Sequence, residues 1–264
     1  MTAGSFLTDD GCRIVYDYQP RTGTPVILFS PSLGTAMALF DAQAEALGAH
    51  FSVLRYDMRG HGASDAPDGG YAMDRLGRDV VELLDHLEIE KAHFLGVSLG
   101  GMTGQWLGYR APERIDRLIL ANTSAYMGPP AGWEDRIAAV LESGMGPMVE
   151  PVLERWFTPD FRESGDAAVE KIGQLLERTK ATGYAGCSAA IRDMDMRPIL
   201  SLISVPTLVV AGLRDPATPP EHAQYLANNI PDASFVELNA AHLSNVELPD
   251  EFSVAVRNFL GVPS

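Results

Sequence analysis

Short runs of apolar residues recur along the chain, and each ends in residues that are typical of turns. A near-continuous apolar run of this length indicates a strand that is covered on both faces, as in a parallel sheet. We therefore predict a mostly parallel sheet with strands at residues 25–30, 51–57, 91–97, 115–121, 206–212 and 234–239.

Helical periodicity fills the stretches between the first of these runs. The clearest case is residues 74–88, where charged residues occupy one face and the other face carries the apolar residues Leu76, Val80, Leu83, Leu84 and Leu87. Strand and helix alternate in this way until about residue 122. Such alternation predicts right-handed crossovers, with helices on both faces of the sheet.

The alternation stops between residues 126 and 195. This stretch contains helix-like segments, Trp133, Trp156 and several Pro or Gly breaks, without a convincing strand. We therefore predict an α/β core formed by residues 1–125 and 196–264, with residues 126–195 inserted as a helical cap. A chain of 264 residues is long enough to build one such domain around a large core.

The segment Gly96–Val97–Ser98–Leu99–Gly100 lies between a predicted strand and a predicted helix. In that context the pattern Gly-x-Ser-x-Gly is typical of a nucleophile elbow, a strained turn in which the glycines leave room for the backbone. The pattern alone is weak because both residue types are common. The flanking strand and helix make it specific, and we predict that Ser98 is a nucleophile.

A serine hydroxyl needs a base that takes its proton, and the base needs an acid that orients it. In the α/β-hydrolase fold both follow the nucleophile along the chain, the acid before the histidine and each after a strand. Asp215 and His242 occupy these positions. We therefore predict an α/β-hydrolase fold with Ser98, Asp215 and His242 as its catalytic triad. His61 is the one competing histidine, and because it precedes Ser98 we expect it to form a turn and contribute to binding at most.

Acyl transfer also needs hydrogen-bond donors for the oxyanion, usually backbone N–H groups. The residue after the nucleophile, Leu99, supplies one donor in this fold. The second comes from the loop after the strand at 25–30, and there we predict Leu33.

The net charge of the chain is −15, which repels phosphate backbones and anionic lipid. We therefore expect no nucleic-acid or membrane partner. The two cysteines, Cys12 and Cys187, lie far apart and outside metal-ligand spacings, so we expect free thiols and no metal site. The first ten residues show no secretory signal, and no segment reaches the roughly 20 apolar residues of a membrane span. Together these features predict a cytoplasmic protein.

Several segments resemble the 3-oxoadipate enol-lactonases, bacterial enzymes of the β-ketoadipate route of aromatic degradation. The resemblance extends over nearly the whole chain and is carried by residues 32–35 (SLGT), 55–64 (RYDMRGHGAS), 100–107 (GGMTGQWL), 153–159 (LERWFTP) and 241–245 (AHLSN). The motifs around the predicted triad are shared by many relatives. The run GMTGQWLG at 101–108 and the segment at 153–159 point more narrowly to this family.

The resemblance implies a serine hydrolase that opens the ring of an unsaturated lactone with an acetate side chain and needs no cofactor. The same triad suits other cap-bearing hydrolases, namely a C–C hydrolase of ring-cleavage products, a carboxylesterase or a perhydrolase. It also suits a ligand receptor built on the same fold. These alternatives stay open on sequence alone, as does the oligomeric state.

A small anionic substrate needs a local positive group in a chain of net charge −15. Arginine suits a carboxylate because its planar fork donates two parallel hydrogen bonds. The cap offers Arg136, Arg155, Arg162, Arg178 and Arg192. We predict that Arg136 binds the carboxylate together with Trp133, which lies three residues earlier and shares a helix face with it. A core tryptophan beside a solvated arginine is the alternative interpretation.

Overall fold

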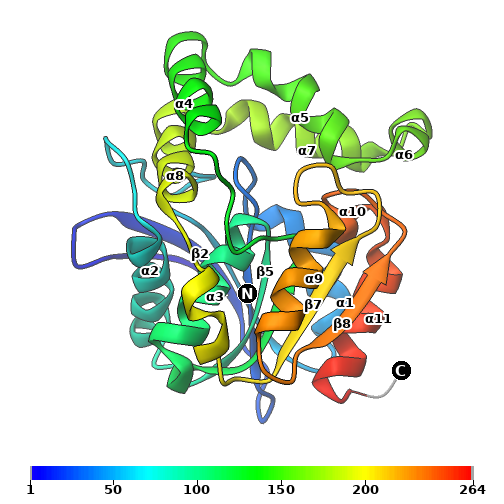
Figure 1. The fold of residues 1–264 in the computed structure, drawn as a ribbon. Helices are drawn as coiled ribbons and strands as arrows, with labels where there is room; N and C mark the ends of the chain where they lie inside the picture. Colours follow the sequence, from blue (N-terminus) through cyan, green and yellow to red (C-terminus); the bar gives the residue numbers. More distant parts are fainter. Residues whose placement is uncertain (1, 263–264) are drawn as a thin grey trace.

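An eight-stranded sheet forms the centre of the computed structural model, which describes residues 2–262 (Figure 1). The strands lie in the order β1-β2-β4-β3-β5-β6-β7-β8. β1 and β2 form an antiparallel hairpin that pairs antiparallel with β4, and the other neighbours pair parallel. Their bounds are Thr2–Leu7, Arg13–Gln19, Val26–Ser30 (β3), Ser52–Asp57 (β4), Ala92–Val97 (β5), Ile115–Ala121 (β6), Thr207–Gly212 (β7) and Ser234–Leu238 (β8). The predicted fold class, an α/β fold with a mostly parallel sheet, is confirmed.

Each of the six predicted strands is present, with bounds that agree to within one residue. β3, β5 and β7 are buried at every position, which explains their continuous apolar runs. The hairpin of β1 and β2 was not predicted. Ile14 and Tyr16 of β2 are buried while Arg13 and Val15 are less so, an alternating pattern that marks a strand covered mainly on one face.

Helices cover both faces of the sheet (Figure 1). α1 (Asp41–Leu47) packs against α11 (Pro249–Leu260), and α2 (Met73–His86) packs against α3 (Leu99–Arg110), while α9 (Pro220–Asn229) packs against β7. α2 ends two residues before the predicted residue 88. Glu88 adopts a φ of 54°, in the left-handed region, so the helix cannot continue through it.

Helices α4 to α8 lie above the carboxyl end of the sheet, where the parallel strands end (Figure 1). Their bounds are Ala131–Ser143, Val149–Trp156, Pro159–Glu163, Ala167–Arg178 and Ala181–Asp193, and the short α10 (Ser244–Glu247) belongs to the core below. α4 packs on α8 and α5 on α7. We propose that residues 126–195 are the cap and residues 1–125 and 196–264 the core, of which residues 1, 263 and 264 lie outside the described part of the chain.

Two further features concern membranes and metals. Among residues 2–262, no helix combines the length and the apolar character that a bilayer crossing requires. In the same range, no three His, Cys, Asp or Glu side chains are grouped in a way that could hold a metal ion.

Candidate active site

Ser98 stands at the turn between β5 and α3, with the strained dihedral angles φ 56° and ψ −114°. The glycines on either side are required by close backbone approaches. A Cβ at Gly96 would lie 2.2 Å from the backbone of Gly100, and a Cβ at Gly100 would lie 2.0 Å from the carbonyl oxygen of Ser30. The structure therefore has the backbone of a nucleophile elbow at the predicted position.

Two hydrogen bonds hold this strained turn in place. The Ser98 N–H donates to the carbonyl oxygen of Ala121 over 2.9 Å, and the Thr123 hydroxyl donates to the carbonyl oxygen of Ser98 over 2.7 Å. Both partners lie at the end of β6, the strand next to β5. The strain at Ser98 is thus balanced by contacts with the neighbouring strand.

Asp215 and His242, from the loops after β7 and β8, lie beside each other at the same end of the sheet. His242 Nδ1 is 2.8 Å from Asp215 Oδ2, and both residues are buried. Because an ionised carboxylate only accepts hydrogen bonds, Nδ1 carries the proton and Nε2 is left free to accept one. This is the tautomer that a general base requires.

Asp215 accepts further hydrogen bonds from three groups of its own loop and one from another strand end. Oδ1 accepts from the N–H groups of Ala217 and Thr218 over 2.8 and 2.9 Å. Oδ2 accepts from the Thr218 hydroxyl over 2.7 Å and from Asn122 Nδ2 over 3.1 Å. Burial by itself raises the pKa of Asp215, but the charge and hydrogen bond of His242 and the Thr218 donors outweigh it, so the pKa lies below its ordinary value.

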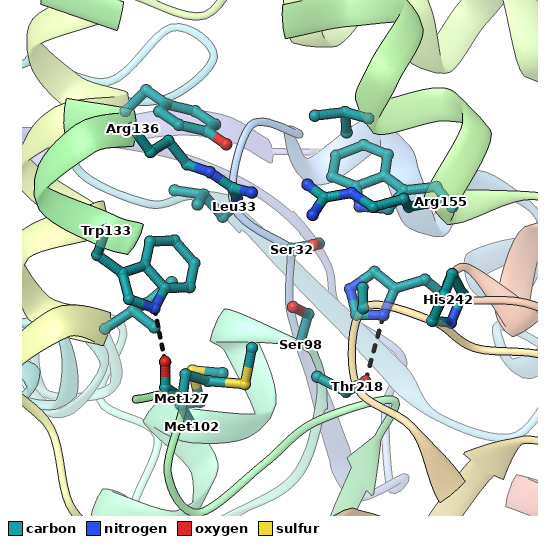
Figure 2. A pocket seen from close by; sticks show the side chains of 16 residues that line it. Ser32, Leu33, Ser98, Met102, Met127, Trp133, Arg136, Arg155, Thr218 and His242 are labelled. Atoms are coloured by element: carbon teal, nitrogen blue, oxygen red, sulfur yellow. Dashed lines mark hydrogen bonds between the residues drawn. The ribbon is translucent and has the colours of Figure 1, made fainter. Parts of the chain in front are cut away.

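Ser98 and His242 face each other across one hollow (Figure 2). Within residues 2–262, no hydrogen bond joins the Ser98 hydroxyl to His242 Nε2. Such bonds are often long in the free enzyme and shorten when substrate binds. The geometry therefore brings the three predicted triad residues together, with the acid–base contact already formed.

Leu33, the predicted second oxyanion donor, lies in the loop after β3 and lines the same hollow as Ser98. Neither its N–H nor that of Leu99 donates to another group within residues 2–262. Both donors are thus free for an oxyanion. Leu99 is the first residue of α3, so the positive end of the helix dipole adds to its effect.

His61 supports the loop that carries Leu33. Its Nε2 accepts a hydrogen bond from the Gly34 N–H over 2.8 Å, so Nδ1 carries the proton and faces the carbonyl oxygen of Arg59 at 3.2 Å. Burial lowers the pKa of His61 to about 4, which keeps the ring neutral near pH 7. Both ring nitrogens are engaged, which leaves neither for proton transfer from Ser98.

This buried histidine predicts an acid-sensitive contribution to stability. An exposed histidine has a pKa near 6.5, so the unfolded chain binds a proton that folded His61 takes up only near pH 4. Stability is therefore lost as pH falls from about 6.5 to 4, by on the order of 3 kcal/mol. The variant His61→Gln should lack this loss when urea unfolding is measured between pH 7 and 4.

The exposed His50 provides the matched control for this measurement. The variant His50→Gln should follow the pH dependence of the wild-type protein. If the curves for His61→Gln and wild type run parallel, the buried imidazole does not contribute as described.

The hollow above Ser98 encloses about 580 Å³ including its open mouth. The predicted Trp133 and Arg136 both line it, from α4. The Arg136 guanidinium lies 4.8 Å from the centre of the Trp133 ring, and Trp133 Nε1 donates to the carbonyl oxygen of Met127 over 2.8 Å. The structure thus places the aromatic ring and the cation together in the wall of the hollow.

Several residues of this site were not singled out by sequence reasoning. Arg155 was named among the cap arginines, but Arg136 was predicted as the carboxylate ligand. In the structure Arg155 also lines the hollow, opposite Arg136. The buried Ser32 hydroxyl lines it too and has no hydrogen-bond partner within residues 2–262. Asn122 holds Asp215 from the end of β6. Its place directly after a predicted strand was the only available signal.

Comparisons with known proteins agree with this geometry. The family model described as the alpha/beta hydrolase fold matches residues 25–249. The protein named 3-oxoadipate enol-lactonase 2 from Acinetobacter baylyi is 44% identical over 95% of this chain and 94% of its own length.

Two solved structures are also similar. One is a hydrolase from Pseudomonas aeruginosa, 48% identical, with a TM-score of 0.96 over 98% of both chains. The other is the enol-lactonase from Burkholderia xenovorans, 39% identical, with a TM-score of 0.95 over 98% of this chain and 100% of its own. The similarity therefore includes the cap as well as the core.

Proposed function

The chain belongs to the α/β-hydrolase family and, within it, to the 3-oxoadipate enol-lactonases, and we propose that it hydrolyses 3-oxoadipate enol-lactone to 3-oxoadipate in aromatic degradation. The observation that carries this proposal is one hollow that contains Ser98, His242 and two arginines, Arg136 and Arg155, neither of which has a carboxylate partner within residues 2–262. An ester-cleaving triad and a cation fit a lactone that bears a carboxylate.

The reaction begins when the Ser98 oxygen attacks the ring carbonyl carbon and His242 takes the hydroxyl proton. The tetrahedral oxyanion lies against the N–H groups of Leu33 and Leu99. Its collapse breaks the ring C–O bond, and the enol oxygen leaves with the proton from His242. The enol then tautomerises to the ketone, still attached to Ser98 as an ester.

Water completes the cycle. His242 takes a proton from a water molecule, whose oxygen attacks the acyl carbon, and Ser98 leaves with that proton. Asp215 stabilises the positive charge that His242 carries at each step. Because an enol is a good leaving group, the oxyanion donors contribute most to the attack of Ser98.

Steady-state rates on three substrates test this function. We expect the highest kcat/KM on the enol-lactone, with lower values on a neutral aryl ester and a vinylogous diketone. A higher value on the ester would favour a carboxylesterase, and a higher value on the diketone a C–C hydrolase. A single turnover without further cycles would favour a receptor.

Arg136 provides a second, more specific test. A charged hydrogen bond contributes roughly 1.5 to 3 kcal/mol, so Arg136→Ala should lower kcat/KM for the lactone acid about 10-fold to 150-fold. The same change should scarcely affect a neutral ester of similar size. Equal losses on both substrates would remove Arg136 from carboxylate recognition.

The remaining proposals concern partners and location. A small anionic lactone is the proposed partner, and the charge of −15 supports the absence of nucleic-acid and membrane partners. The cytoplasmic location stays a prediction.

A further inference from the structure

Two arginines extend into the hollow above Ser98 from different cap helices. Arg136 belongs to α4 and Arg155 to α5, and Figure 2 shows their guanidinium groups facing each other across the hollow. Neither forms an ion pair with a carboxylate of residues 2–262. By contrast, the cap residues Arg162 and Arg192 each have a carboxylate partner.

The wall of the hollow provides no negative charge to balance these two cations. Its lining contains no aspartate or glutamate. Tyr184 also lines it, and burial raises the pKa of its phenol, so it stays neutral beside both arginines. Burial lowers the pKa of Arg155, and repulsion by the nearby positive charge of Arg136 lowers it further. A bound anion would relieve that repulsion.

A third polar group lies in the same hollow. The Ser32 hydroxyl is fully buried, has no partner within residues 2–262, and appears in Figure 2 between the two guanidinium groups and Ser98. A buried hydroxyl without a partner costs free energy, so it too favours a polar ligand.

We propose that Arg136 and Arg155 together form a two-arginine site that binds one carboxylate between them, which makes Arg155 a second specificity-determining residue. The ligand class is a small carboxylate with a flat apolar body, because Trp133 and Met102 form part of the same wall. The identity of the natural ligand rests on the proposed function. The binding of a carboxylate by this pair does not require turnover and can be measured separately.

Calorimetric titration with phenylacetate tests the site, with the neutral phenylacetamide as the matched probe. Arg155→Met and Arg136→Met should each weaken phenylacetate binding roughly 10-fold or more and leave phenylacetamide binding unchanged. The double variant should lose less than the product of the two single losses, because both groups bind the same carboxylate. Arg162→Met, which removes a cap arginine outside the hollow, should bind phenylacetate as the wild type does.

The melting temperature of each variant shows whether it is folded. If Arg155→Met is folded and binds phenylacetate as tightly as wild type while Arg136→Met does not, the two-arginine site is wrong. Multiplicative losses in the double variant would also contradict a shared carboxylate. Intact phenylacetate binding without turnover of the enol-lactone would instead refute the proposed function and leave this site standing.

Discussion

Replacement of Ser98 by alanine is expected to lower kcat by several orders of magnitude while the protein stays folded. In the proposed mechanism this hydroxyl forms the covalent ester, and the proposed oxyanion donors, the backbone N–H groups of Leu33 and Leu99, remain in the variant. Residual catalysis from such donors and from binding is on the order of 10³ to 10⁴ over the reaction in water. The Ser98 turn is held by backbone contacts with the end of β6, which the substitution leaves in place.

Mass spectrometry separates the loss of the nucleophile from a loss of structure. Wild-type protein mixed with a slowly hydrolysed ester should gain the mass of one acyl group, and Ser98→Ala should gain none. Ser188→Ala, which removes another buried serine hydroxyl in the cap, serves as the control and should be acylated normally. Retention of more than about a tenth of wild-type kcat in Ser98→Ala would rule out the proposed mechanism.

The parts of the fold that could be predicted are those whose sequence pattern reflects burial directly. Strands β3, β5 and β7 are covered on both faces, so apart from His93 of β5 every residue is apolar or small and the run is visible. The hairpin of β1 and β2 lies at the edge of the sheet and is covered mainly on one face, which leaves only a short alternation around Ile14 and Tyr16. Weak periodicity over so few residues does not distinguish a strand from a loop.

The candidate site likewise contains residues that the sequence pattern predicts and residues that only the packing reveals. Ser98, Asp215 and His242 each follow a strand in a fixed order, so local sequence and chain order were enough to place them. Arg155 differs from Arg162 only in what lies around it. Arg162 of α6 has glutamate partners on α5, whereas Arg155 has none and lines the hollow, a difference that depends on how the cap helices pack. Sequence reasoning cannot supply that packing.

Asp215→Asn is expected to lower kcat by about 10⁴-fold, the loss known for the equivalent change in the serine-protease triad. Asp215 accepts hydrogen bonds from five groups: His242 Nδ1, the Thr218 hydroxyl, Asn122 Nδ2 and the N–H groups of Ala217 and Thr218. An asparagine has one acceptor oxygen and an amide that donates.

The backbone N–H groups of Ala217 and Thr218 are fixed, so the asparagine oxygen should stay with them and its NH₂ group should face His242 Nδ1. The imidazole then adopts the other tautomer, with the proton on Nε2, and cannot take a proton from Ser98. Because Asp215 does not line the hollow in which we propose that substrate binds, KM should change little. Asp68→Asn, at an exposed position, should leave kcat unchanged. A kcat for Asp215→Asn within tenfold of wild type, with an unchanged melting temperature, would mean that another group orients His242.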